Sequence, residues 1–463
     1  MKIPIVRTVL FSTLLLVLAA VTFGQTGVTT YTGTLADGAT YLIEVPSNWN
    51  GTLFLFSHGY VVPGSDNPAQ DVSDPATRSF LLSSGFALAG SSYAKTGYAV
   101  EEALGDQIAV LDIFSSTVGA PKRTIAWGRS MGGMITAGLI QRYPDRFNGA
   151  MPMCGVVSGG VGAWNAMLDS EFAFKTLLTP DSGLQLVKIS DPWGNLGLAE
   201  QALAAAQGTS QGRARLALVS ALYDIPGWFT PLSPEPAPTD FATQEANQFL
   251  WAQYVDFPFF FALRAEMEAR AGGNPSWNTH VNYRKQLEQS ADTREVRALY
   301  EQAGLDLDAD LKLLNESVRI KADPWATAYL VQNIIYDGDI HLPVLTLHTT
   351  GDGLIPVENE SAYTQIVREE GNGEFLRRAS VARAGHCAFT PAETVAGMLT
   401  LLNRLETGEW HHVHAADLNN KAAGLGPSLN IFILPDGTAV PVAAGFEEFK
   451  PNRYLRPFDA EDE

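Results

Sequence analysis

Short apolar runs alternate with helical patterns along the first third of the chain, and this alternation limits the choice of fold. Residues 52–57 form a nearly wholly apolar run, as expected of a strand that is covered on both faces. The other strands are predicted at residues 28–33, 40–45, 86–90, 123–127 and 149–154. The helices are predicted at residues 76–83, 100–114 and 131–142. Successive strand–helix–strand units indicate an α/β fold, with a mostly parallel sheet flanked by helices.

The alternation of predicted strands and helices resumes late in the chain after a long interruption. Strands at residues 343–348 and 375–381 alternate with helices at residues 358–368 and 392–405. The two blocks are separated by about 180 residues, which is far longer than an ordinary connection between neighbouring elements. We therefore predict a large helical cap, inserted between strands 6 and 7 of the core.

The predicted organisation begins with a signal peptide. Its signs are the positive charges of Lys2 and Arg7, an apolar run at residues 9–21, and the small residues Thr22 and Gly24 before the cleavage point. A membrane anchor is the alternative, but the run is shorter than the ~20 residues that a spanning helix needs. We expect a secreted or periplasmic protein with no stable membrane insertion after cleavage. The predicted parts are a signal peptide (1–24), the first part of the core (25–160), a cap or lid (161–340), the second part of the core (341–406) and a C-terminal extension with a hairpin (407–463).

Large apolar side chains, most of them aromatic, gather in one stretch of the predicted cap. They are Phe249, Leu250, Trp251, Tyr254, Phe257, Phe259, Phe260 and Phe261. Such residues are typical of a core of the cap's own. A minority of them facing the active site would instead form an apolar acyl or aromatic pocket.

The charge balance excludes some partners. The chain has 31 Lys plus Arg against 50 Asp plus Glu, a formal net charge of −19. Nucleic acid and anionic membrane surfaces would repel such a protein. We expect no nucleic-acid partner.

One motif has the pattern of a catalytic nucleophile. Gly128-Arg129-Ser130-Met131-Gly132 fits G-x-S-x-G, and it lies between the predicted strand at 123–127 and the predicted helix at 131–142. In that setting the serine sits on a tight strand-to-helix turn with its hydroxyl exposed. A second match, centred on Ser210, follows an Ala-rich helical segment instead. Ser130 is therefore the predicted nucleophile.

A serine hydroxyl needs a base and an acid, here in the chain order Ser, Asp, His. Asp352 follows the strand at 343–348, and His386 follows the strand at 375–381, so both lie at the same sheet edge as Ser130. The competing acids, Asp337 and Asp339, precede their strand and belong at the opposite edge. The competing histidines are His58 and His348, the latter within a predicted strand.

An oxyanion hole is the third requirement of this chemistry. The backbone N–H groups of Met131 and Tyr60 are the predicted donors, because one follows the nucleophile and the other lies in the loop after residues 52–57. The substrate pocket is predicted to involve side chains that lie near this edge or in a polar-aromatic part of the cap. They are His58, Ser92, Tyr93, Trp277 and Tyr283.

On these motifs the chain resembles the α/β-hydrolases. The resemblance implies a serine hydrolase that works through an acyl-enzyme, with no cofactor and no metal. His386-Cys387 is similar to the His-Cys pair of the tannase and feruloyl esterase branch, where the cysteine is bonded to one that precedes the nucleophile. This chain departs there, because Arg129 precedes Ser130. Cys154 ends the strand after the nucleophile helix, so a Cys154–Cys387 disulfide is the hypothesis, with two free buried thiols as the alternative. Ser130-Met131-Gly132-Gly133 also resembles the prolyl-oligopeptidase-like peptidases.

The predicted activity is hydrolysis of a small-molecule or polymer-derived carboxylic ester. A peptidase or amidase with the same triad is the first alternative, because the acyl-enzyme chemistry is shared. A catalytically silent binding protein on this fold is the second.

Overall fold

The structure, a computed structural model, describes residues 20–23, 27–434 and 436–457. The strands are β1 (Ala20–Phe23), β2 (Val28–Thr34), β3 (Thr40–Pro46), β4 (Thr52–Ser57), β5 (Ala87–Ser91), β6 (Arg123–Arg129), β7 (Gly149–Met153), β8 (Val344–Gly351), β9 (Leu376–Ala384), β10 (Ile431–Ile433), β11 (Ala439–Pro441) and β12 (Phe446–Glu447). The α-helices are α1 (Pro75–Ser83), α2 (Val100–Thr117), α3 (Met131–Arg142), α4 (Gly159–Leu178), α5 (Pro192–Gln207), α6 (Ser210–Ala221), α7 (Phe241–Trp251), α8 (Arg264–Ala271), α9 (Tyr283–Gln289), α10 (Thr293–Ala303), α11 (Leu307–Glu316), α12 (Pro324–Gln332), α13 (Asn359–Glu369), α14 (Pro391–Thr407) and α15 (Ala415–Gly424). A 3-10 helix, η1 (Pro144–Arg146), and two π-helices, η2 (Ala252–Asp256) and η3 (Phe259–Leu263), complete the described elements.

The main sheet has ten strands in the order β1-β2-β3-β5-β4-β6-β7-β8-β9-β12. Strands β4 to β9 pair in parallel, whereas β1, β2, β3 and β12 are antiparallel to their neighbours. The predicted α/β-hydrolase fold with a mostly parallel sheet is confirmed. In this order the carboxyl ends of β4, β6, β8 and β9 reach the same edge, which is where open α/β sheets build their sites.

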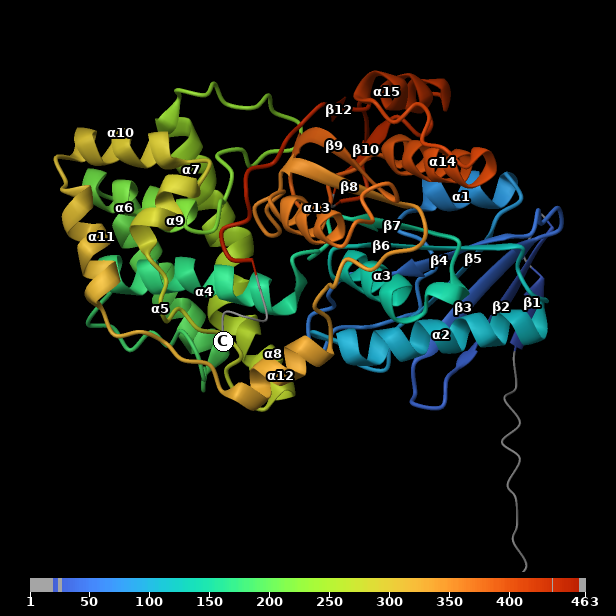
Figure 1. Cartoon of the computed structure of the whole chain (residues 1–463), viewed down its shortest axis with the longest axis horizontal. Coiled ribbons are helices and arrows are strands. Elements are labelled where there is room, and N and C mark those ends of the chain that lie inside the picture. The colour runs from blue at the N-terminus through green and yellow to red at the C-terminus, as the bar shows by residue number, and fades with distance from the viewer. Residues whose placement is uncertain (1–19, 24–26, 435, 458–463) are drawn as a thin grey trace, which may run out of the picture.

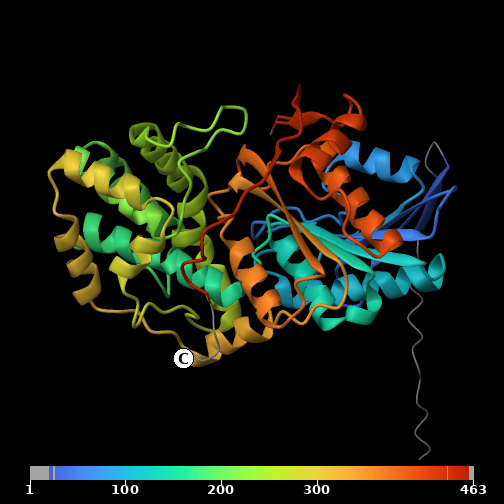
Figure 2. The same cartoon turned by 45° about the horizontal axis from the view of Figure 1, so that its top comes forward.

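The apolar run of β4 shows how the sheet is buried on both faces. Leu53 and Leu55 belong to one hydrophobic cluster, and Phe54 and Phe56 to another, because successive side chains of a strand point to opposite faces. The first cluster continues into α2, α3 and α13, and the second into α1, α14 and α15. Two layers of helices therefore cover the sheet (Figures 1 and 2).

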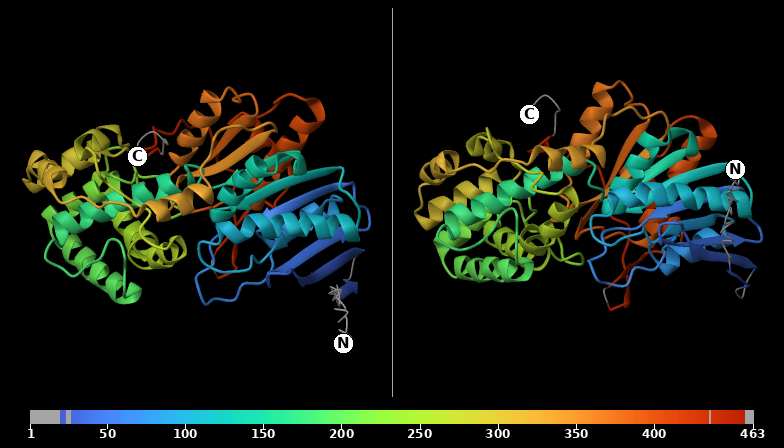
Figure 3. Two further views of the ribbon diagram at one scale, coloured as in Figure 1. Left: turned by 60° about the horizontal axis from the view of Figure 1, so that its bottom comes forward. Right: turned by 90° about the horizontal axis from the view of Figure 1, so that it is seen from below.

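The chain between β7 and β8 forms α4 to α12, which lie together beside the sheet (Figure 3). The aromatic stretch runs from α7 through η2 into η3. Four of its eight large side chains, Trp251, Phe257, Phe260 and Phe261, are buried and join the core cluster. This stretch therefore supplies part of the interior of the helical group.

The C-terminal extension contains a strand that the sequence did not suggest. The predicted hairpin is confirmed as β10 and β11, but β12 also pairs with the edge strand β9. The chain then crosses to the helices of the insertion, as the red segment of Figure 1 shows. There Arg456 pairs with the fully buried Asp169 at 2.6 Å and donates a hydrogen bond to the carbonyl oxygen of Trp277 at 2.9 Å.

The predicted signal peptide lies outside the described residues, apart from β1, which pairs with β2. Within the described ranges, no helix combines the length and the apolar character needed to cross a membrane.

Removal of the Arg456 side chain should destabilise the protein. Asp169 would lose its cation while staying buried, so we expect Arg456→Ala to lower the free energy of unfolding by about 3 kcal/mol. Denaturant unfolding checks this, with Arg453→Ala, an exposed arginine of the same segment, as the control. Equal free energies of unfolding for the two variants would show that the contacts of Arg456 with the insertion do not stabilise the fold.

Candidate active site

Ser130 lies on a sharp turn between β6 and α3. Its backbone has φ 60° and ψ −128°, a conformation that costs energy for a residue with a side chain. A Cβ on Gly132 would come within 1.9 Å of the Ser57 carbonyl oxygen, and one on Gly128 within 2.5 Å of the same atom. Glycine is therefore required on both sides, and the turn matches a nucleophile elbow.

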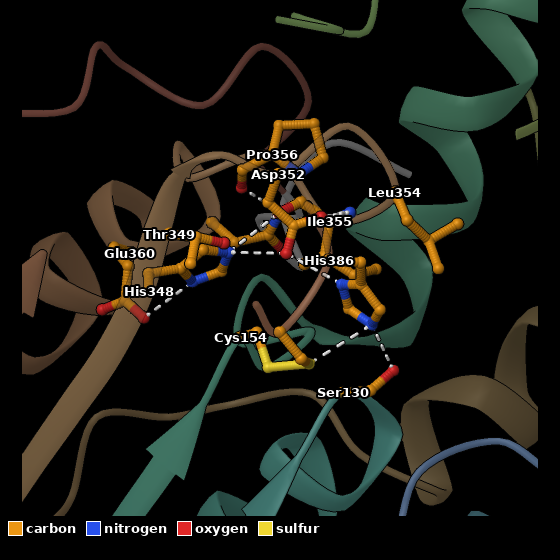
Figure 4. Close-up of polar contacts among 12 residues, drawn as sticks. Ser130, Cys154, His348, Thr349, Asp352, Leu354, Ile355, Pro356, Glu360 and His386 are labelled. Carbon is orange, nitrogen blue, oxygen red and sulfur yellow. Dashed lines mark hydrogen bonds and ion pairs between the residues drawn. A yellow bond between two sulfur atoms is a disulfide. The ribbon is translucent and has the colours of Figure 1, made fainter. Parts of the chain in front are cut away.

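A continuous chain of hydrogen bonds joins Ser130, His386 and Asp352 (Figure 4). With a proton on Nδ1, His386 donates to Asp352 Oδ2 at 2.8 Å, and its Nε2 accepts from the Ser130 hydroxyl at 2.8 Å. The other Asp352 oxygen accepts from the Ile355 N–H at 3.0 Å, and the side chain is fully buried. This geometry can remove the serine proton and stabilise the imidazolium that results.

A second histidine lies buried behind the acid, away from Ser130 (Figure 4). Nε2 of His348 is 3.6 Å from Asp352 Oδ2, and its Nδ1 is 3.2 Å from Glu360 Oε1. Burial lowers the pKa of His348, but the hydrogen bond and charge of Glu360, together with the charge of Asp352, outweigh burial and leave the pKa above 6.5. His348 is thus a neighbour of the acid rather than of the serine.

A disulfide joins Cys154, at the end of β7, to Cys387, the residue after His386. The two Cα atoms are 5.4 Å apart, and Cys387 Sγ lies 3.5 Å from His386 Nε2. The bridge therefore ties the loop that carries His386 to a central strand of the sheet.

The predicted oxyanion donors lie beside the serine. A Cβ on Gly59 would be only 3.2 Å from the Ser130 Cβ, so the loop after β4 passes directly over the nucleophile. Within the described part of the chain, neither the Tyr60 N–H nor the Met131 N–H donates a hydrogen bond. Met131 opens α3, where the first amides have no acceptor in the helix. Both amides are available to a developing negative charge.

A small apolar pocket of about 50 Å³ opens at Ser130. Its lining comes from the core and from the helices of the insertion, and consists of Tyr60, Tyr98, Ser130, Met131, Val156, Ala163, Trp164, Met167, Phe259, Leu354 and Ile355. The Tyr60 ring packs edge-on against Phe259 at 5.3 Å, and its buried hydroxyl has no hydrogen-bond partner among the described residues. Apart from Ser130 and the rings of Tyr60, Tyr98 and Trp164, the lining side chains are therefore aliphatic or Phe and Met.

The prediction that His58, Ser92 and Tyr93 line the pocket was wrong. The ring nitrogens of His58 lie 2.7 Å and 3.1 Å from the carbonyl oxygens of Gly59 and Ser92, and the ring stacks on Tyr93 at 3.9 Å. The Tyr93 hydroxyl donates to the His58 carbonyl at 2.9 Å. These side chains are buried and support the loop that carries Tyr60.

The same prediction was wrong for Trp277 and Tyr283 in the insertion. The Tyr283 hydroxyl donates to Asp169 at 3.1 Å and accepts from Asn278 at 2.8 Å. The backbone N–H of Trp277 donates to Asn165 at 2.9 Å. Both residues belong to a polar network inside the helical group and do not line the pocket at Ser130.

The sequence analysis missed most of the pocket wall. Trp164 and Met167 lie on α4, which is buried over most of its length, so its sequence gives no amphipathic pattern to mark a pocket face. Phe259 comes from the aromatic stretch that was considered for this role, and it alone of that stretch lines the pocket.

Comparison with known proteins identifies relatives of the chain. It is 31% identical to o-phthalyl amidase from Xanthobacter agilis over 445 residues, a match that covers 88% of this chain and 94% of that protein. Residues 87–173 match the model of the prolyl oligopeptidase family. That segment includes Ser130 but neither Asp352 nor His386.

Solved structures are also similar. An esterase from Aspergillus oryzae is 15% identical, with a TM-score of 0.44 and coverage of 83% of this chain and 81% of that one. Feruloyl esterase B from Aspergillus oryzae is 13% identical, with a TM-score of 0.42 and the same coverage of both chains.

His348 should make stability depend on pH. Because folding raises its pKa above 6.5, its contribution is full below about pH 6.5 and is lost as the pH rises through the raised value. The unfolding midpoint of the wild type should therefore exceed that of His348→Gln most at about pH 6, and the gap should shrink toward about pH 9. Glu360→Gln is the control, since it removes the partner that raises the pKa. A gap that does not change with pH would contradict the charged pair.

Proposed function

We propose that this chain, which belongs to the α/β-hydrolase family of serine hydrolases that includes o-phthalyl amidase, is an exported hydrolase of carboxylic esters with a compact aromatic acyl group. The observation that carries the proposal is that the hydrogen-bonded chain of Ser130, His386 and Asp352 opens onto an aromatic and aliphatic pocket. A flat, apolar acyl group suits a narrow pocket lined by aromatic rings.

Each side chain of the site has a defined step in this proposal. Ser130 Oγ attacks the carbonyl carbon while His386 Nε2 takes the hydroxyl proton, and the carbonyl electron pair moves onto oxygen. The tetrahedral intermediate then expels the alcohol, which receives that proton. A water molecule attacks the acyl-enzyme by the same route and releases the acid. Asp352 holds the imidazole in the required tautomer throughout.

The oxyanion is stabilised by donors that are in place before the substrate binds. These donors are the free amides of Tyr60 and Met131. Donors fixed in advance are worth more in an apolar site than in water, because no water has to reorganise during the reaction.

Amides are the second candidate substrate class. The relative from Xanthobacter agilis is named as an amidase. An amide would form the same acyl-enzyme, but His386 must protonate a poorer leaving group before the bond breaks. We therefore expect esters to react faster than amides of the same acid.

Export is supported by two features of the chain. The N-terminal pattern is that of a signal peptide. The Cys154–Cys387 disulfide fits the same proposal, because such bonds persist in oxidising compartments.

A paired assay tests the activity and its nucleophile. Initial rates are measured on 4-nitrophenyl benzoate and on benzoyl-4-nitroanilide. Ser130→Ala should lower kcat on the ester by at least about 10³-fold while the fold is retained. Ser210→Ala is the matched control, because Ser210 lies in the second G-x-S-x-G match and should leave kcat unchanged. Ester turnover that survives in Ser130→Ala would refute the assignment, and amide turnover equal to that of the ester would make the protein an amidase.

The pocket also predicts a preference between acyl groups. No side chain among its described lining residues is charged. Burying a carboxylate without a counter-charge is costly, so we expect benzoyl esters to exceed 2-carboxybenzoyl esters in kcat/KM by at least about tenfold. Matched 4-nitrophenyl esters give the ratio. A preference for the 2-carboxybenzoyl ester would show that a cation reaches the pocket.

A further inference from the structure

The imidazole of His348, on β8, is buried between two carboxyl groups (Figure 4). Its Nε2 lies 2.8 Å from the carbonyl oxygen of Ile355 and 3.6 Å from Asp352 Oδ2. Its Nδ1 lies 3.2 Å from Glu360 Oε1. A carbonyl oxygen and an ionised carboxylate can only accept hydrogen bonds. Both ring nitrogens therefore need a proton, which makes His348 an imidazolium ion.

The charge balance of this buried region agrees with a cation at His348. Among the described residues, no Lys or Arg forms an ion pair with Asp352 or Glu360. The other partner of Asp352, His386, has to be neutral to act as a base. Two buried carboxylates without a cation would be costly. Burial lowers the pKa of His348, but Glu360 and Asp352 outweigh burial and keep it above 6.5.

Four further titratable groups interact with one of the two carboxylates. They are Tyr363 of α13 and Arg378 of β9, which interact with Glu360, and Tyr223 and Asp256 of the insertion, which interact with Asp352. Burial raises the pKa of the two tyrosines facing helix and insertion and that of the aspartate, and so favours their neutral forms. None of the four forms a hydrogen bond or ion pair with His348 in the part of the chain that the structure describes. The two carboxylates are therefore its charged partners there.

His348 also fastens the loop that carries the acid. The Ile355 carbonyl oxygen accepts from His348, while the Ile355 N–H donates to Asp352 Oδ1 at 3.0 Å. Both backbone groups of one residue thus connect the acid to β8. The side chains of Leu354 and Ile355 line the pocket at Ser130. Movement of this imidazole would therefore displace the acid and one wall of the pocket.

We propose that His348, charged by its pairing with Glu360, is a positioning residue of the active site that offsets part of the negative charge of Asp352. His386 then remains a neutral base to a lower pH than it would beside an isolated carboxylate. The physical reason is that both rings approach the same oxygen, Asp352 Oδ2, at 3.6 Å and 2.8 Å. A positive charge on one ring disfavours a proton on the other. The proposal rests on the function proposed above, since it concerns the same triad.

The pH dependence of Ser130 labelling by phenylmethanesulfonyl fluoride tests this role on the full mature chain. Ser130 Oγ attacks the sulfur, His386 takes the hydroxyl proton and fluoride leaves, so the rate follows the neutral form of His386 for any natural substrate. Intact-protein mass gives the rate of adduct formation from about pH 5 to about pH 9. His348→Gln keeps a donor for the Ile355 carbonyl but removes the charge. It should raise the midpoint of the acidic limb by about one pH unit.

Further variants separate the charge from a loosened structure. His341→Gln removes an exposed histidine before β8 and should leave the midpoint unchanged. Glu360→Gln should raise the midpoint as His348→Gln does, because His348 then loses the anion that keeps it charged. Glu360→Asp retains a carboxylate and should stay close to the wild type. A loosened loop would instead lower the rate at every pH and leave the midpoint in place.

Several outcomes would overturn the proposal. An unchanged midpoint in both His348→Gln and Glu360→Gln would mean that the two side chains share a neutral hydrogen bond. A midpoint that moves to lower pH in either variant would contradict the sign of the effect. A shift in His348→Gln alone would show that the charge does not depend on Glu360. If His348→Gln does not fold, the two Glu360 variants decide. A wild type that forms no adduct at Ser130 would refute the proposed nucleophile itself.

Discussion

The close contact between the Ser57 carbonyl oxygen and the backbone of Gly132 is the constraint on which the active site depends. It packs the end of β4 against the start of α3, and the space left would not admit one methyl group. As a result the β4 loop lies over Ser130, and the turn at Ser130 adopts its strained backbone. The nucleophile and the proposed oxyanion amides are therefore placed by backbone packing, which no side-chain rotation can undo.

The acid and the base are held by different means. Asp352 is fully buried, and a negative charge there is tolerated because the Ile355 N–H, His386 and His348 all approach its oxygens. The loop of His386 is fastened covalently through Cys387 to the end of β7. Residues of the same Asp352 loop line both the pocket at Ser130 and a second cavity of about 440 Å³.

The core elements could be predicted because their signals are local. In β4, six successive apolar or small residues leave no polar face, and a strand with both faces covered explains that pattern. Ser130 and Asp352 directly follow β6 and β8, and His386 lies two residues past the end of β9, so the topology of a parallel sheet alone brings them to one edge. The same reasoning from topology failed for the predicted pocket residues. His58 and Tyr93 lie near the edge but pack against each other, and Tyr283 lies inside the helical insertion.

The sequence by itself determined the central strands of the sheet, the strand-to-helix turn at Ser130 and the three side chains that the structure joins by hydrogen bonds. These features depend on the spacing of apolar residues along the sequence and on Gly128 and Gly132, which the turn at Ser130 requires. The tertiary structure decided how the insertion meets the core, and with it that Trp164, Met167 and Phe259 face Ser130. The physical reason is that α4 is buried on nearly every side. Its apolar sequence therefore predicts that the helix is buried, but it does not predict which of its side chains face Ser130.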